Sequence, residues 1–223
     1  MGCLTRHRIF SILLLVLCQL TGKAQVQWTT PRPIDLPPDG QRDCLAMAVD
    51  DSGNIGVVWN EGAFTYSQII FARSSDLGVT WTRVVAYGGT HTYDDEARCS
   101  WNIAFDHNGT IWLLWSYFPG LSRPARLHLS KSTNNGQSFD TVFSAQQHGV
   151  LYPRLAVDRF NSIYILWADV QFKLTRFRYG NIGERTDSEI PNDTLLVDRF
   201  CALSVRANLT VHCFWEGLRW VGT

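Results

Sequence analysis

The sequence predicts an all-β fold, chiefly because one strand–turn–strand segment recurs four times along its 223 residues. Each copy ends in a tryptophan, and successive tryptophans are 56, 52 and 48 residues apart: Trp59, Trp115, Trp167 and Trp215. Repeats of this length that consist only of strands are typical of β-propeller blades. We therefore predict four-stranded antiparallel blades, three of them full (about 42–90, 98–147 and 152–198) and a partial fourth (about 200–223).

The turn inside each repeat is the second observation. The position nine residues before the tryptophan is acidic in three copies and basic in the fourth: Asp50, Asp106, Asp158 and Arg206. Three residues further on, Gly53 and Gly109 provide the left-handed backbone that such a turn needs, and Asn161 tolerates it. Leu209 occupies this position in the fourth copy and does not suit it, so we expect a distorted fourth hairpin.

A second turn motif joins the two outer strands of the first two blades. The first copy is Ser74-x-Asp76-x-Gly78-x-Thr-Trp81, and the second is softened: Ser132, Asn134, Gly136 and Phe139. We expect a structural role, in which the Asp or Asn side chain bonds turn amides, the glycine takes a positive φ and the aromatic ring fills the gap between sheets. Only Asn181-Ile-Gly183 survives in the third blade, whose outer hairpin should be irregular.

These motifs carry a family resemblance. The chain resembles the Asp-box (BNR-repeat) β-propellers, and among them the sialidase superfamily, over roughly residues 42–220. Sialidase propellers have six blades, so the resemblance implies a partial or truncated member, part of a larger ring. A compact four-bladed ring is the alternative. The resemblance also implies a carbohydrate-directed protein, with exo-sialidase-type glycoside hydrolysis as its enzymatic form, although Asp-box turns lie far from a sialidase active site and also occur in non-enzymes.

Candidate ligand-binding residues lie on the long connections, which share the end of the propeller opposite the short turns. Sialidases hold the sugar carboxylate with three arginines, whose planar forks suit it. The candidates for substrate binding are Arg42, Arg98, Arg154, Glu61, Asp94 and Asp95. Arg42 matches the family's first arginine in position only, because Asp43-Cys44 follows it in place of Ile-Pro. Solvated strand-entry arginines and a solvated acidic loop are the competing structural explanations.

The family's catalytic residues are not identifiable in this sequence. A sialidase uses a Glu-activated Tyr as nucleophile and an Asp as acid/base. No Asp lies between Asp51 and Asp76, where the acid/base is expected, and the Tyr–Glu pair belongs to later blades that this chain lacks. Two hypotheses therefore stay open. One is an exo-sialidase-type hydrolase, and the other is a non-catalytic binding or scaffold propeller, or a fragment of a larger Asp-box protein.

The first 24 residues have the pattern of a secretory signal peptide, with Arg6 and Arg8 before an apolar run and cleavage near Ala24. Residues 25–223 would then form the propeller domain, secreted or periplasmic, with 17 basic and 20 acidic residues. This balance argues against nucleic acid and acidic membrane partners. A glycan or glycoconjugate is the expected ligand, a protein partner is left open, and neither a cofactor nor a metal is predicted.

Four cysteines remain after the predicted cleavage: Cys44, Cys99, Cys201 and Cys213. An exported protein can form disulfides, so free thiols and a single disulfide are both open. The repeat register predicts that Cys201 pairs with Phe214 across the last hairpin and that Cys201 and Cys213 lie on opposite faces.

Overall fold

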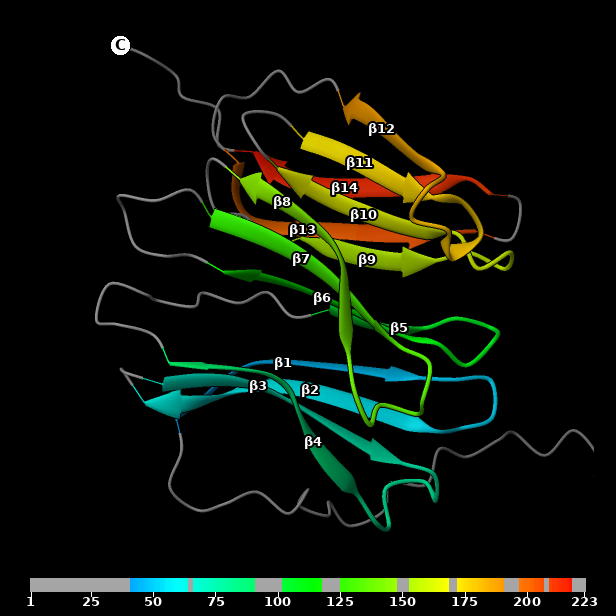
Figure 1. Cartoon of the computed structure of the whole chain (residues 1–223). Helices are drawn as coiled ribbons and strands as arrows, with labels where there is room; N and C mark the ends of the chain where they lie inside the picture. The colour runs from blue at the N-terminus through cyan, green and yellow to red at the C-terminus, as the bar shows by residue number, and fades with distance from the viewer. Residues whose placement is uncertain are drawn as a thin grey trace, which may run out of the picture. The chain divides into compact units, whose positions relative to one another are not determined.

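A computed structural model describes residues 41–63, 66–90, 102–117, 125–147, 153–168, 172–190, 197–206 and 209–217. The chain divides into two compact units, Met1–Pro33 and Ile34–Thr223, and every described residue belongs to the second. These residues form three four-stranded antiparallel sheets and one two-stranded sheet (Figure 1). The predicted all-β class and its four-stranded blades are confirmed.

The sheets follow the chain as blades 1 to 4. Blade 1 comprises β1 (Gln41–Val49), β2 (Ile55–Ala63), β3 (Tyr66–Ser74) and β4 (Thr82–Thr90). Blade 2 comprises β5 (Asn102–Phe105), β6 (Ile111–Tyr117), β7 (Ala125–Ser132) and β8 (Asp140–Gln147). Blade 3 comprises β9 (Arg154–Val157), β10 (Ile163–Ala168), β11 (Phe172–Phe177) and β12 (Arg185–Ile190), with a 3-10 turn η1 (Arg178–Gly180). Blade 4 is the hairpin of β13 (Val197–Val205) and β14 (Val211–Gly217).

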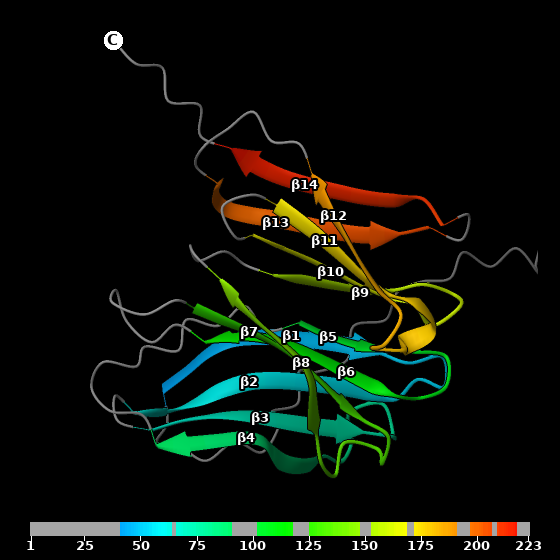
Figure 2. The same ribbon diagram turned by 45° about the horizontal axis from the view of Figure 1, so that its top comes forward.

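Each full blade is a meander whose strands pair in chain order, so its first strand lies at one edge of the sheet. These edge strands contact one another in series: β1 packs against β5, β5 against β9, and β9 against β13. The first strand is therefore the inner strand of each blade, as a propeller requires. Figures 1 and 2 let the reader follow the order of the blades. The ring is not closed within the described part of the chain.

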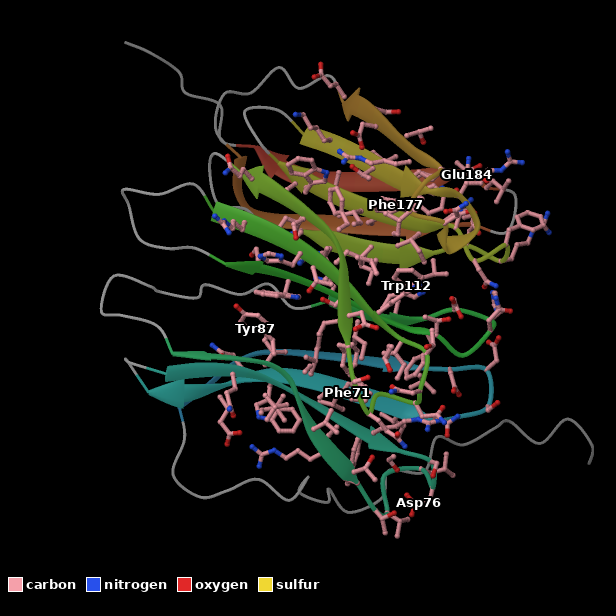
Figure 3. The ribbon with its side chains drawn as sticks, viewed as in Figure 1. Phe71, Asp76, Tyr87, Trp112, Phe177 and Glu184 are labelled. Atoms are coloured by element: carbon pink, nitrogen blue, oxygen red, sulfur yellow. The ribbon has the colours of Figure 1, made fainter. Side chains whose placement is uncertain are left out.

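Apolar side chains from facing blades form the cores between them. Between blades 1 and 2, Val58, Ile69 and Phe71 pack with Leu113 and Trp115, all at most 3% exposed. A second core between blades 2 and 3 is built in the same way: Trp112, Leu114, Leu127, Leu129, Phe143, Ile163, Ile165, Trp167 and Phe177. Burial of this kind contributes about 25 cal/mol per Å² of apolar surface. Figure 3 labels Phe71, Trp112 and Phe177 among these side chains.

The acidic position of the repeat caps the short turn between the first two strands. In blade 3, the buried Asp158 carboxylate accepts hydrogen bonds from the amides of Phe160 and Ser162, each at 2.8 Å, and from the Tyr164 hydroxyl at 3.0 Å. Asp106 and Asp50 accept the corresponding amide bonds in blades 2 and 1. The repeated aspartate is thus explained by its structural role.

The expected distortion of the fourth hairpin is not found. The Leu209 amide donates to the Arg206 carbonyl at 2.9 Å, and the Arg206 amide donates to the Thr210 carbonyl at 3.0 Å. Asn161 makes the equivalent bond in blade 3, also at 2.9 Å. Leu209 adopts a φ of 65°, so the turn keeps its shape and the backbone strain falls on this leucine.

The predicted register of the last hairpin is wrong by one residue. Cys201 pairs with Trp215, and Leu203 pairs with Cys213. The hairpin keeps the register of the other copies, because Ser204 pairs with His212 as Ala104 pairs with Trp112 and Ala156 with Tyr164. Both cysteine positions therefore fall on the same face of the hairpin, because residues of equal parity share a face. Cys213 is a free, half-buried thiol whose pKa is raised by burial.

The outer hairpin of blade 3 is irregular, as its degenerate motif predicts. The 3-10 turn η1 follows β11 directly, and Gly180, within that turn, takes the positive φ, at 65°. The Asn181 side chain accepts a hydrogen bond from the Gly183 amide at 3.0 Å. The asparagine therefore keeps a turn-capping role although the rest of the motif is lost.

Candidate functional site

The short turns and the long connections lie at opposite ends of each blade, because every inner strand begins at the long-connection end and ends in a short turn. In Figure 3, Asp76 lies at the short-turn end of blade 1, and Tyr87 lies toward the other end. The two ends must be considered separately, because one carries the β3–β4 and β7–β8 turns and the other carries the candidate ligand-binding residues.

The turn between β3 and β4, residues 74–81, is held by hydrogen bonds among its own side chains and amides. The Asp76 carboxylate accepts from the Thr80 amide at 2.9 Å, from the Thr80 hydroxyl at 2.6 Å and from the Ser74 hydroxyl at 2.7 Å. The Ser74 hydroxyl in turn accepts from the Gly78 amide at 2.8 Å. The bonds from Thr80, and then that from Ser74, lower the pKa of Asp76 to about 2. The Asp76 carboxylate therefore forms these hydrogen bonds within its own turn.

The turn between β7 and β8, residues 132–139, repeats this arrangement and connects two blades. Asn134 accepts from the Ser138 amide at 3.1 Å, and the Gly136 amide donates to Ser132 at 2.9 Å. Phe139 packs in the core between blades 1 and 2, where its ring meets Phe71 edge-on at a centroid distance of 5.2 Å. Its aromatic ring therefore fills the gap between sheets.

Two of the candidate arginines occupy the starts of inner strands. Arg154 is the first residue of β9 and is half-buried, with its Nη1 donating to the Pro153 carbonyl at 3.3 Å. Arg42 is the second residue of β1, where it pairs with Glu61 in the strand register. Strands β1 and β9 both contact β5, and Figure 1 shows them running in the same direction, so these two positions lie at the same end of their blades.

Glu61 has a partner of its own. Its carboxylate forms an ion pair with Arg83 of β4, and the glutamate is 9% exposed. The Arg83 guanidinium also lies over the Trp59 ring, 5.8 Å from its centroid. This pairing neutralises the one carboxylate of the candidate set that the structure describes. Arg98, Asp94 and Asp95 lie outside the described residues.

An aromatic cluster near the long-connection end was not predicted from the sequence. The rings of Trp115 and His128 stack with centroids 4.2 Å apart, and Tyr87 of blade 1 contacts Trp115 at 4.5 Å. Burial, and then the nearby Arg126 charge, lower the pKa of His128 to about 4. His128 is therefore neutral at pH 7. The signal available in the sequence was weak, because Tyr87 and His128 belong to no repeated position.

The described residues contain neither a metal-binding cluster nor a membrane-spanning helix. Within these ranges, no group of three or more His, Cys, Asp or Glu side chains could hold a metal ion. No helix of the described segments is both long and apolar enough to span a membrane.

The blades and their inner strands define the class of protein: a β-propeller with four-stranded antiparallel blades. No protein-family model matches the sequence, and no curated protein matches it. Solved structures with similar folds include a leech intramolecular trans-sialidase, with a TM-score of 0.49 and 14% identity over 76% of this chain and 27% of that one. A Hadza microbial sialidase gives a TM-score of 0.39 and 15% identity over 63% of this chain and 33% of that one.

A third similar structure is an ulvan lyase, a polysaccharide lyase, with a TM-score of 0.45 and 14% identity over 64% of this chain and 42% of that one. The chain thus spans between about a quarter and a half of the length of these three proteins. At such identities the similarity concerns the fold alone, and a fold does not define a reaction.

Proposed function

We propose that this protein is an exported, carbohydrate-directed propeller that binds an acidic sugar at the long-connection end of its inner strands. The observation that carries the proposal is the placement of Arg42 and Arg154 at the starts of β1 and β9, two strands that share β5 as a neighbour. An arginine fork binds a carboxylate through two parallel hydrogen bonds. Arg98, four residues before β5, is the third proposed contributor.

Recognition without catalysis fits the described side chains better than hydrolysis does. Tyr87 contacts Trp115, and the Tyr164 hydroxyl donates to Asp158, so neither of these two tyrosines is paired with a glutamate. Glu61 is held by Arg83. A sialidase nucleophile needs a Tyr–Glu pair, and none of these groups is arranged to supply it.

Calorimetric titration with sialyllactose and with lactose tests the proposal. We expect binding of sialyllactose only, and at least a tenfold weaker affinity for both Arg42→Ala and Arg154→Ala, because each change removes a carboxylate contact. Arg159→Ala is the matched control, since Arg159 lies exposed in a short turn at the opposite end, over the Phe160 ring. Equal affinity for lactose, or unchanged binding by both variants, would contradict the proposal.

Export is the second part of the proposal, and it has a direct test. The N-terminal pattern of residues 1–24 supports cleavage near Ala24. Mass spectrometry of protein expressed with its native N-terminus should give a mature chain beginning at Gln25. Retention of residues 1–24 in the recovered protein would contradict this part without affecting the sugar-binding proposal.

A further inference from the structure

The short turn between β5 and β6 contains a sequence motif that neither the blade repeat nor the proposed sugar site explains. Asn108-Gly109-Thr110 matches Asn-x-Thr, the sequence at which oligosaccharides are attached to asparagine in exported proteins. An attached oligosaccharide is bulky, so its asparagine must lie at the surface with room around it. All three residues belong to the described part of the chain, and Asn108 and Gly109 are exposed.

Two further copies of the motif occur in the sequence, beginning at Asn192 and Asn208. Neither of these asparagines belongs to the described residues. Asn208 occupies the turn position in blade 4 that Asn108 occupies in blade 2, because each stands seven residues before its repeat tryptophan. Two of the three copies therefore share one position of the repeat, and Asn108 is the copy whose surroundings are described.

The turn keeps its shape without help from the Asn108 side chain. The Asp106 carboxylate accepts hydrogen bonds from the amides of Asn108 and Thr110, each at 2.9 Å. The Gly109 amide donates to the Asp106 carbonyl at 3.0 Å. The Asn108 carboxamide forms no hydrogen bond with any residue that the structure describes. Its Nδ2 is therefore available to react, while Asp106 caps the backbone of the turn.

Other asparagines among the described residues use their side chains within the fold. The Asn54 carboxamide donates to the Asp50 carboxylate at 2.6 Å. The Asn102 carboxamide donates to the Pro153 carbonyl at 2.9 Å. These contacts explain the two asparagines structurally, whereas Asn108 has no comparable contact to explain it.

The tip of the turn is open, although its first residues are held between neighbouring blades. Apart from its chain neighbours, a Cβ on Gly109 would have no heavy atom within 4 Å. The His107 amide donates to Asn161 Oδ1 of blade 3 at 2.8 Å, and His107 Nδ1 lies 2.6 Å from Asp51 Oδ2 of blade 1. The short turns lie opposite the long connections, so an oligosaccharide on this turn leaves the proposed sugar-binding end uncovered.

We propose that Asn108 carries an N-linked oligosaccharide in the exported protein. The co-reactant is an oligosaccharide joined through C1 of its first sugar to a lipid diphosphate. A bond forms between Asn108 Nδ2 and C1 as the bond from C1 to the diphosphate oxygen breaks. The lipid diphosphate leaves with that electron pair, and one Nδ2 proton passes to a base of the transferring enzyme. Attachment requires export of the chain, so this assignment rests on the export part of the proposed function.

Peptide mass spectrometry of the full chain, secreted with its native N-terminus from eukaryotic cells, tests the assignment. Trypsin places the three motifs in separate peptides: residues 99–126, 186–199 and 207–219. A peptide N-glycosidase in water enriched in heavy oxygen turns a glycosylated asparagine into a labelled aspartate, and we expect this label at Asn108. Asn108→Gln and Thr110→Ala should each remove the glycan from peptide 99–126, and either suffices if the other is not secreted. Thr110→Ser keeps the motif and should retain the glycan.

Asn135 is the matched control within the same protein. It is an exposed asparagine in another short turn of blade 2 and also precedes a glycine, but Gln137 takes the place of the threonine. Because both asparagines precede a glycine, both are open to spontaneous deamidation, and only the label at Asn108 should depend on the glycosidase.

An unlabelled Asn108 in a chain that begins at Gln25 would overturn the assignment and leave export intact. Equal labelling of Asn108 and Asn135, or a glycan that persists on peptide 99–126 in Thr110→Ala, would also overturn it. A recovered chain that retains residues 1–24 and carries no glycan would contradict export as well. Titration with sialyllactose tests the sugar-binding proposal independently of all these outcomes.

Discussion

At the residue scale, the repeated aspartate of the inner hairpin contributes more to folding stability than its position in a surface turn suggests. Asp158 is 2% exposed and accepts three hydrogen bonds, so its removal leaves two amides and the Tyr164 hydroxyl without their acceptor. Buried groups left unsatisfied cost about 1–3 kcal/mol. Asp158→Ala should lower the free energy of unfolding by this amount in urea titrations.

Arg206→Ala is the internal control for that prediction. Arg206 occupies the equivalent position in blade 4 and is exposed, and the backbone bonds from the Leu209 amide to Arg206 and from the Arg206 amide to Thr210 hold its turn without a carboxylate at this position. A loss of stability for Arg206→Ala equal to that for Asp158→Ala would mean that the turn, and not the carboxylate cap, sets the cost.

The lowered pKa of His128 predicts that the folded protein loses stability as the pH falls below 6.5. Its folded-state pKa is about 4, while its ordinary value is 6.5, chiefly because burial disfavours the charged ring. The unfolded chain therefore binds a proton near pH 6.5 that the folded chain binds only near pH 4. The stability contributed by His128 is fully present above pH 6.5 and is lost as the pH falls toward 4. His128→Gln should flatten the loss of melting temperature over this interval; an unchanged slope would show that other groups cause it.

At the scale of the element, the fourth hairpin shows how a backbone conformation can prevail over an unsuitable residue. Leu209 keeps the left-handed conformation that Gly53, Gly109 and Asn161 adopt in the other copies. A residue with a Cβ costs roughly 1–2 kcal/mol in the left-handed conformation, and replacing it by glycine removes this cost. Part of the gain is offset because glycine gives the unfolded chain more conformational entropy. Leu209→Gly should therefore stabilise the hairpin by roughly 1 kcal/mol, measured as slower amide exchange in β13 and β14. Asn161→Gly should change little, because asparagine tolerates this conformation; a similar gain there would contradict the argument.

The same hairpin shows where sequence reasoning stopped. The recurring tryptophan, acidic and glycine positions are sufficient to predict the blades and the side-chain hydrogen bonds of their turns, because those features depend on local geometry. The irregularity between Val197 and Cys201 has no local signal. The pairing of Cys201 with Trp215 follows the register of the other copies, so the predicted pairing with Phe214 misaligned the repeats by one residue. In the candidate site, the ion pair of Glu61 with Arg83 joins residues 22 positions apart through the sheet register, which spacing alone does not reveal.

At the scale of the whole molecule, Gly136 of blade 2 allows a close approach to Phe71 of blade 1. A Cβ on Gly136 would lie 2.1 Å from the Phe71 ring of blade 1, whereas a Cβ on Gly78 would have its nearest neighbour at 3.6 Å. Both glycines have nearly the same φ, 83° and 84°, so both alanine variants carry the same backbone strain. Gly136→Ala should cost about 1–3 kcal/mol more than Gly78→Ala, because it also overpacks the core between blades. Thermal unfolding of both variants measures the difference, and equal melting temperatures would exclude the steric contribution.

The whole chain should also be inactive toward sialosides. Neither Tyr87 nor Tyr164 is paired with a glutamate among the described side chains, and the sequence has no Asp between Asp51 and Asp76. We expect no release of fluorophore from a fluorogenic sialoside. Release that Arg42→Ala abolishes would establish catalysis and replace the binding hypothesis.

The packing of Phe139 against Phe71 bears on how this protein can be divided. Phe139, which ends the β7–β8 turn of blade 2, belongs to the core that this blade shares with blade 1. A fragment that stops at the end of β4 would expose Phe71, and one that starts at β5 would carry Phe139 without its counterpart. Limited proteolysis should consequently release the first two blades together, and recombinant boundaries placed between them would yield insoluble halves.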